Sequence, residues 1–189
     1  MPIVGQFGSL AGFGVFPGGA FESIATVTVG SGGASSIEFT SIPGTYQHLQ
    51  IRLLARFTST TVVSSAQCRF NSDTTAANYA THYLYGDGAS AAAGASTSSG
   101  MVLIGTTGGS SWASTFGASV VDILDYTSTS KNKVIRSLSG ADVNGAGGYL
   151  QMFSGVWINS SSAITSLSIY QGSQTFGQYT TAALYGVRA

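Results

Sequence analysis

Charged side chains are scarce in this chain of 189 residues. Lys, Arg, Asp and Glu make up 7% of the residues, and the seven basic side chains balance the seven acidic ones. Ordinary soluble proteins carry about 25% charged residues. A net charge near zero gives no long-range attraction to nucleic acid or to an anionic membrane, and we expect neither as a partner. Weak charge also means weak repulsion between copies, which favours a chain that functions inside an assembly.

Cysteine and long apolar runs are also nearly absent. Cys68 is the single cysteine, so an internal disulfide is excluded. Its strand-like context, AQCRFN, predicts a buried thiol that acts as a small hydrophobic residue. No stretch approaches the roughly 18 consecutive apolar residues of a membrane span, and glycines interrupt the apolar N-terminus, unlike in a signal peptide. We therefore expect synthesis in the cytoplasm of the cell that expresses the protein.

Residues that perform chemistry are few and far apart. The chain has seven acids and two histidines. Asp122 and Asp125 are three residues apart in a predicted strand, which places their carboxylates on opposite faces. His48, His82 and Cys68 lack the local pairing of ligands that is typical of a zinc site. We expect no catalytic residue, no metal site and no cofactor, and an enzyme stays open only as a minority alternative.

The repeated feature of the chain is a short run rich in Val, Ile, Thr, Tyr and Phe, bounded by Gly, Ser, Asn or Pro. Such runs predict strands, and they occur at residues 21–29, 35–42, 46–57, 66–71, 101–105, 118–126, 132–138, 148–158, 164–170 and 179–187. Residues 86–100 and 139–148 have the small or Gly-rich composition of loops, and a helical turn fits around residues 74–86. The pattern predicts a nearly all-β chain, folded as a sandwich or a barrel.

Alternation within the third run separates a core face from a wet face. One face holds Leu49, Ile51, Leu53 and Phe57, and the other holds His48, Gln50, Arg52 and Arg56. Over the whole chain we expect a core that includes Leu49, Ile51, Leu53, Phe57, Phe70, Ile123, Trp157 and Leu167. Leu54 interrupts the wet face, and two interpretations are open: contact with a neighbouring subunit, or a scattered surface leucine.

The first 20 residues differ in character from the rest. Phe7, Phe13 and Phe16 are separated by glycines, and no charged side chain occurs among residues 1–20. Glycine makes ordering costly, and nothing local offsets that cost. We therefore expect an extended arm over residues 1–20 that orders against a partner through its phenylalanines, and a folded domain over residues 21–189. A tail without a role is the alternative, although its phenylalanines would promote aggregation.

Four stretches carry a resemblance to a known group of proteins. FESIATVTVG, IEFTSIPGTYQHLQIRLLAR, RFNSDTTAANYATHYLYGDG and YTTAALYGVR, taken in order within residues 21–189, resemble a group of tailed-bacteriophage virion proteins. The most specific parts are SIPGTYQHLQIR and NYATHYLYGDG. The resemblance implies an antiparallel β-sandwich of jelly-roll type that sits on the virion surface, and it brings no catalytic residues.

The resemblance leaves two positions on the virion open. A capsid decoration (cement) protein would bind and stabilise the assembled shell of the major capsid protein, with the arm in the seam between capsomers. A tail-fibre or receptor-binding module would instead expose loops for glycan contact, with Trp112 and Tyr149, which flank Gly-rich loops, as aromatic platforms. We expect the decoration protein and, by the same resemblance, a homotrimer. Trp157, in MFSGVWI, is expected in the core.

Overall fold

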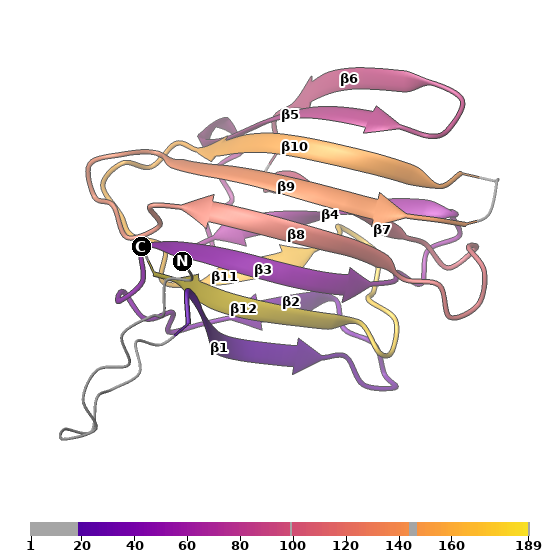
Figure 1. Ribbon diagram of the computed structural model, residues 1–189, viewed down its shortest axis with the longest axis horizontal. Coiled ribbons are helices and arrows are strands. Elements are labelled where there is room, and N and C mark those ends of the chain that lie inside the picture. The colour runs from indigo at the N-terminus through magenta and orange to yellow at the C-terminus, as the bar shows by residue number, and fades with distance from the viewer. Residues whose placement is uncertain (1–18, 99, 144–146, 189) are drawn as a thin grey trace, which may run out of the picture.

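The computed structural model describes residues 19–98, 100–143 and 147–188. Two antiparallel sheets pack face to face, and the larger one has eight strands (Figure 1). The order across this sheet is β1 (Phe21–Thr28), β12 (Thr181–Val187), β3 (His48–Ala55), β8 (Gly117–Leu124), β9 (Lys133–Ala141), β10 (Tyr149–Trp157), β5 (Tyr79–Gly86) and β6 (Ala91–Ser96). The predicted antiparallel β-sandwich is confirmed.

The smaller sheet has four strands and is paired in a nested way. Its order is β2 (Ser36–Phe39), β11 (Leu167–Tyr170), β4 (Val63–Phe70) and β7 (Met101–Thr107). Along the chain, the pairing of β1 with β12 encloses that of β2 with β11, which encloses β3 with β8 and then β4 with β7. The four strands outside this nest, β9, β10, β5 and β6, extend the larger sheet beyond β8.

The core lies between the two sheets, where the predicted side chains meet. Phe57 stacks on Phe176 with ring centroids 4.4 Å apart, and Phe70 packs against both Tyr79 and Trp157. Every residue that we predicted for the core is buried, namely Leu49, Ile51, Leu53, Phe57, Phe70, Ile123, Trp157 and Leu167. Cys68 is also buried, and burial raises the pKa of its thiol to about 12, so it is an inert hydrophobic residue as expected.

Two strands were not predicted. All of the predicted strands are present, with ends that differ by a few residues. The prediction of a loop over residues 86–100 is wrong, because Ala91–Ser96 form β6 and pair with β5; Ala and Gly have weak β propensity, so tertiary pairing rather than local pattern makes this a strand. The helical turn expected around residues 74–86 is one 3₁₀ turn, η1 (Ala76–Asn78), which β5 follows at once. The loop predicted over residues 139–148 is shorter, since β9 continues to Ala141.

The two ends of the sandwich differ in what they carry. Phe21, where β1 begins, pairs with Val187, where β12 ends, so the described chain enters and leaves the fold at one end (Figure 1). Thr28 pairs with Thr181 at the opposite end, where the loops after β3, β7 and β11 lie. Within the described ranges, no helix is both long enough and apolar enough to cross a membrane.

Candidate interaction surfaces

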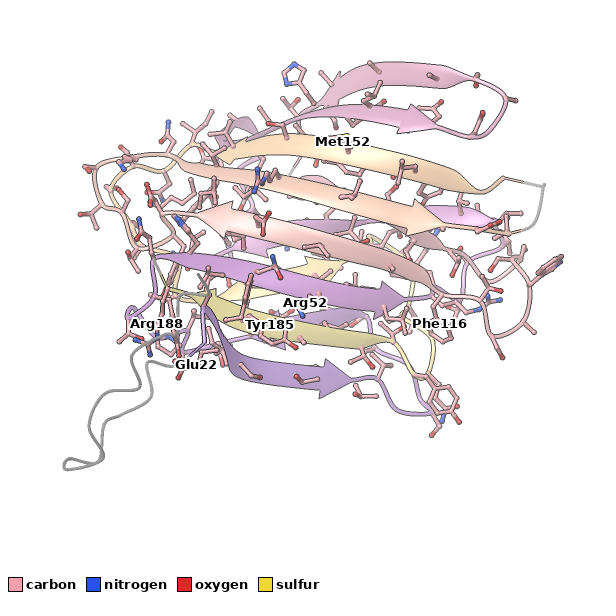
Figure 2. The ribbon with its side chains drawn as sticks, in the orientation of Figure 1. Glu22, Arg52, Phe116, Met152, Tyr185 and Arg188 are labelled. Carbon is pink, nitrogen blue, oxygen red and sulfur yellow. The ribbon has the colours of Figure 1, made fainter. Side chains whose placement is uncertain are left out.

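The outer face of the larger sheet carries a continuous set of exposed apolar side chains. Val120 pairs with Leu138, Leu138 with Met152, and Met152 with Leu84, so these side chains form one row across four neighbouring strands. Each is between 40% and 57% exposed. Figure 2 looks onto this face, with Met152 labelled on β10. Side chains opposite each other on paired strands lie close enough to touch, so the row forms a single apolar surface.

A second row lies beside the first. Leu54 pairs with Ala118, Ala118 with Gly140, and Gly140 with Leu150, and both leucines are exposed. Leu54 is therefore not an isolated surface leucine. We call the two rows together the outer apolar face, which consists of Leu54, Leu84, Val120, Leu138, Leu150 and Met152. A shallow groove of about 680 Å³ runs along it.

The sequence pattern hid this face because β8 and β9 are apolar on both sides. Val121 and Ile135 point into the core, while Val120, Val134 and Leu138 point outward. Strands buried on both faces read as continuous apolar runs. The runs SVVDIL and KVIRSL, which are apolar on both faces of the strand, were the available signal for an outward-facing apolar surface.

A hydrogen-bonded polar band borders the outer apolar face. Gln50 Nε2 donates to Asp122 Oδ1 (2.9 Å), Arg136 Nε donates to Asp122 Oδ2 (3.0 Å), and Arg52 Nε donates to Gln50 Oε1 (3.0 Å). The Arg52 guanidinium also lies 4.8 Å from the centre of the Tyr185 ring, as Figure 2 shows. These contacts engage the charged groups at the border, and the outer apolar face itself carries almost no charge.

An ion pair fixes the end of the sheet from which residues 1–18 depart. Arg188 Nη2 donates to Glu22 Oε2 (2.6 Å) (Figure 2), and this hydrogen bond is the main reason that the pKa of Glu22 is lowered. The backbone N–H of Arg188 donates to the carbonyl of Ala20 (3.0 Å). Phe7, Phe13 and Phe16, the expected anchors of the arm, lie outside the described residues.

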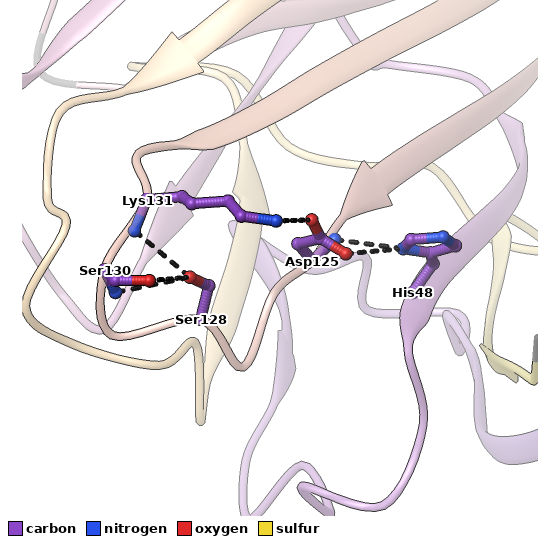
Figure 3. Close-up of polar contacts among 5 residues, drawn as sticks. All are labelled: His48, Asp125, Ser128, Ser130 and Lys131. Carbon is purple, nitrogen blue, oxygen red and sulfur yellow. Dashed lines mark hydrogen bonds and ion pairs between the residues drawn. The ribbon is translucent and has the colours of Figure 1, made fainter.

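One cluster contains the side-chain types of a catalytic triad. His48 Nδ1 lies 3.6 Å from Asp125 Oδ1, Lys131 Nζ donates to Asp125 Oδ2 (2.8 Å), and Ser128 lies in the adjacent turn (Figure 3). The backbone N–H of Asp125 donates to His48 Nδ1 (3.0 Å). Nδ1 is therefore an acceptor, whereas a triad histidine donates from Nδ1 to its aspartate. Lys131 is the main cause of the lowered pKa of Asp125, and the cluster closes a turn rather than orienting a base.

Tyr149 lies in a cleft between the sheets. Its hydroxyl lies within hydrogen-bond distance of the carbonyls of Ser64 (2.7 Å) and Thr106 (2.9 Å) and shares its one proton between them, and burial raises the pKa of that hydroxyl. The cleft has a volume of about 340 Å³, and Asp87 and Gln151 also line it. The ring of Tyr149 therefore joins β10 to β4 and β7, and its polar end is already occupied.

Trp112, the other predicted platform, has the opposite surroundings. It lies in the loop between β7 and β8, and 57% of its side chain is exposed. Trp157 is 1% exposed and belongs to the core, as predicted. The structure therefore presents only one of the two predicted aromatic platforms to solvent. Across the three described ranges, no group of three or more His, Cys, Asp or Glu side chains could hold a metal ion.

The site residues predicted from the sequence are thus dispersed. Trp112 lies at one end of the sandwich, Tyr149 lies in the cleft between the sheets, and the outer apolar face, which the sequence did not predict, lies on one broad side. Searches with this chain find no match among protein-family models, curated proteins or solved structures.

Proposed function

We propose that this protein is a non-enzymatic structural subunit of a phage virion, a capsid decoration (cement) protein that binds and stabilises the assembled shell. The outer apolar face is the observation that carries the proposal. Its six exposed apolar side chains come from five neighbouring strands, and contiguous apolar patches of several hundred Å² mark protein contacts. The assignment to a virion rests on the sequence resemblance.

A second copy of this chain is the partner that we assign to the outer apolar face. A strand of eight residues is about 27 Å long, and eight strands span about 34 Å, so the outer side of the whole sheet, with the outer apolar face on its five central strands, offers on the order of 900 Å². Each partner of a standard interface buries about 800 Å². Because Asp122 is paired with Arg136 and the Arg52 guanidinium lies over the Tyr185 ring, little charge at the border opposes the approach of a second copy. Contact between two identical faces gives a twofold dimer, whereas the expected homotrimer would place this face against a different surface of the next copy.

The nested strand pairing supports a jelly roll as the framework. Without β9, β10, β5 and β6, the sheet orders reduce to β1-β12-β3-β8 and β2-β11-β4-β7. This arrangement results when one long hairpin of paired strands folds back on itself to form two four-stranded sheets. Jelly rolls of this kind occur in viral capsid proteins. The four added strands widen the larger sheet, and they supply Leu84, Leu138, Leu150 and Met152 of the outer apolar face.

Counting copies per particle tests the decoration role. Quantitative mass spectrometry of purified particles should find the protein in a copy number comparable with that of the major capsid protein. A copy number typical of tail components would replace this proposal with the tail-fibre or receptor-binding module, which the exposed Trp112 favours. Absence from particles would reject both virion roles.

We predict that Leu138→Lys, and separately Leu150→Lys, will turn an associated protein into a monomer. Both side chains are more than half exposed, so the change should alter the free energy of unfolding by less than about 0.5 kcal/mol, while placing an ammonium group in the contact. Light scattering at micromolar concentration measures the mass. Ile158→Lys, at an exposed residue just after β10, is the matched control and should stay associated. A monomeric wild type would contradict the assignment of this face.

We also predict that the arm carries attachment to the shell. Deletion of residues 1–18 should leave a folded domain, because it retains Ala20, whose carbonyl accepts the hydrogen bond from Arg188. Co-sedimentation with shells should fall sharply, and Phe7→Ala, Phe13→Ala and Phe16→Ala combined should reproduce most of the loss. Added salt should have little effect, since residues 1–18 have no charged side chain. Unchanged binding by the truncated protein would show that the arm is not the anchor.

A further inference from the structure

The loop that carries Trp112 lies at the end of the sandwich farthest from the arm. It comprises residues 108–116 and leads directly into β8, whose first residue, Gly117, pairs with Ala55 at the end of β3. Phe21, next to the arm, is at the start of β1, at the other end (Figure 1). A protein attached through its arm would therefore direct the 108–116 loop away from the attachment point.

Arg56 holds this loop in one conformation. Its Nη1 donates to Ser111 Oγ (2.6 Å) and to the carbonyls of Trp112 (2.7 Å) and Thr115 (3.0 Å). Its Nη2 donates to the carbonyls of Gly109 (2.9 Å) and Ser111 (3.1 Å). These five hydrogen bonds all end on neutral acceptors. The guanidinium thus turns polar groups of the loop inward, and both of its terminal nitrogens are engaged.

The same residue fixes a second loop that exposes an aromatic side chain. The carbonyl of Arg56 accepts a hydrogen bond from Gly177 N (2.7 Å), and its N–H donates to Thr180 Oγ1 (3.2 Å). Between these two contacts lies Tyr179, which is 67% exposed and has a φ of 70°. A left-handed backbone is unusual for a bulky residue, and such outliers collect at binding sites. Arg56 therefore forms hydrogen bonds with two loops, each of which presents an aromatic ring to solvent.

The exposed side chain of Trp112 contributes little to the free energy of folding. An indole that remains more than half in water forgoes most of the roughly 1.5–3 kcal/mol that burial of a large apolar side chain supplies. A fixed loop also lowers the entropic cost of binding, since the ring is already positioned. These two properties favour a binding role for Trp112 over a role in stability.

The surroundings of Trp112 indicate the chemistry of its ligand. Residues 57–62, 108–116 and 172–181 contain no Asp, Glu, Lys, Arg or His, and they are rich in Ser and Thr. A phosphate or sulfate would find no free cation there. A sugar ring matches both features, because its C–H groups can stack on an aromatic face while its hydroxyls exchange hydrogen bonds with neutral polar groups.

We propose that the 108–116 loop binds a neutral polysaccharide, with one face of a hexose ring stacked on the indole of Trp112. This activity goes beyond attachment to a shell and does not depend on it. Tyr179 lies on the neighbouring loop and would contact a further part of the same glycan chain. Arg56 acts as a positioning residue, because it touches the loops and not the ligand.

Tryptophan fluorescence can test this proposal, because the chain has two tryptophans with opposite exposure. Acrylamide should quench Trp112 and spare Trp157, which is 1% exposed. The full-length protein is titrated with cellohexaose, maltohexaose, mannohexaose and galactohexaose. At least one of these neutral oligosaccharides should protect Trp112 from acrylamide, and sodium chloride should leave the protection unchanged.

Variants assign the protection to the loop. By calorimetry with the same oligosaccharide, Trp112→Ala should weaken binding by about tenfold or more, while Trp112→Phe should retain most of it. Phe21→Ala, which removes an exposed aromatic ring at the opposite end of the sandwich, should bind like the wild type. The deletion of residues 1–18 should also bind the oligosaccharide normally, which separates this test from that of shell attachment.

Three results would overturn the proposal. In the first, none of the four oligosaccharides protects Trp112 in the wild type. In the second, Trp112→Ala binds as tightly as the wild type. In the third, protection occurs only with heparin and disappears as salt is added, which would indicate an anionic ligand. Circular dichroism of Trp112→Ala establishes that it is folded, and because the side chain packs little, its melting temperature should match that of the wild type.

Discussion

Phe57→Ala is expected to lower the free energy of unfolding by about 3–5 kcal/mol, enough to unfold a domain of marginal stability. The Phe57 ring is fully buried and stacks on Phe176 at 4.4 Å. Its backbone N–H donates to the carbonyl of Thr107 (2.9 Å). The residue therefore joins the end of β3, the end of β7 and the segment before β12, and the cavity left by alanine would open where three segments meet.

Guanidinium denaturation followed by circular dichroism measures this loss. Phe21→Ala is a suitable control because Phe21 is 45% exposed, and its loss should cost less than about 1 kcal/mol. The double variant with Phe176→Ala should cost less than the sum of the two single variants, since the two rings share one contact. A cost below about 1 kcal/mol for Phe57→Ala would show that the two sheets do not depend on this contact.

The core of the fold could be predicted because apolar and polar residues alternate along the strands. In β3 and the two residues that follow it, every second residue from Leu49 to Phe57 faces inward, and a one-residue shift of the strand would turn all of these side chains away from the core. These residues needed no knowledge of their partners, since burial of one face follows from the period of the strand alone. Trp157 was expected in the core from its apolar context, MFSGVWI.

Strand β6 could not be predicted because its own sequence does not favour a strand. The sequence AAAGAS has no preference for a strand, and its pairing with β5 depends on the turn at residues 87–90 and on the edge that β5 offers. In that turn, Asp87 Oδ1 accepts hydrogen bonds from the backbone of Ala89 and Ser90. The turn itself depends on local hydrogen bonds of Asp87, but the strand that follows it required the three-dimensional partner.

The candidate sites also combine features that the local sequence predicts with features that depend on the three-dimensional fold. Trp112 could be identified as a candidate from its Gly-rich and Ser-rich surroundings, but the hydrogen bonds from Arg56 to its loop could not be predicted. Alternation assigned Arg56 to a wet face, whereas the structure makes it half-buried, with acceptors 53 to 59 residues away in the sequence. The outer apolar face likewise depends on sheet order, because Leu138 and Met152 become neighbours only through the pairing of β9 with β10.

Asp73 should make the protein lose stability in acid. Trp157 Nε1 (2.8 Å) and Asn78 Nδ2 (2.7 Å) both donate to Asp73 Oδ2, and the backbone N–H of Thr75 donates to Oδ1 (2.9 Å). Burial raises the pKa of Asp73, but these hydrogen bonds outweigh burial and lower the pKa from 3.8 to about 2. The ionised carboxylate is thus the acceptor that satisfies the indole N–H of the buried Trp157.

The sign and size of the effect follow from the lowered pKa. A folded pKa below the unfolded one means that the contribution is complete above pH 3.8 and is lost as pH falls toward about 2. The shift corresponds to about 2 kcal/mol. Asp87 also has a lowered pKa, caused mainly by the backbone N–H of Ser90, but it is exposed and should contribute less because water screens it.

Asp73→Asn should therefore cost about 2 kcal/mol at pH 7, since a neutral amide is a weaker acceptor for the indole, and should remove most of the pH dependence. The measurement is the free energy of unfolding by urea from pH 7 to pH 2, for the wild type and the variant. The two curves should converge as pH falls from 4 to 2, because the wild-type carboxyl is then protonated as well. Asp87→Asn should follow the wild-type curve closely. A difference between wild type and Asp73→Asn that stays constant across this range would show that the charge of Asp73 does not stabilise the fold.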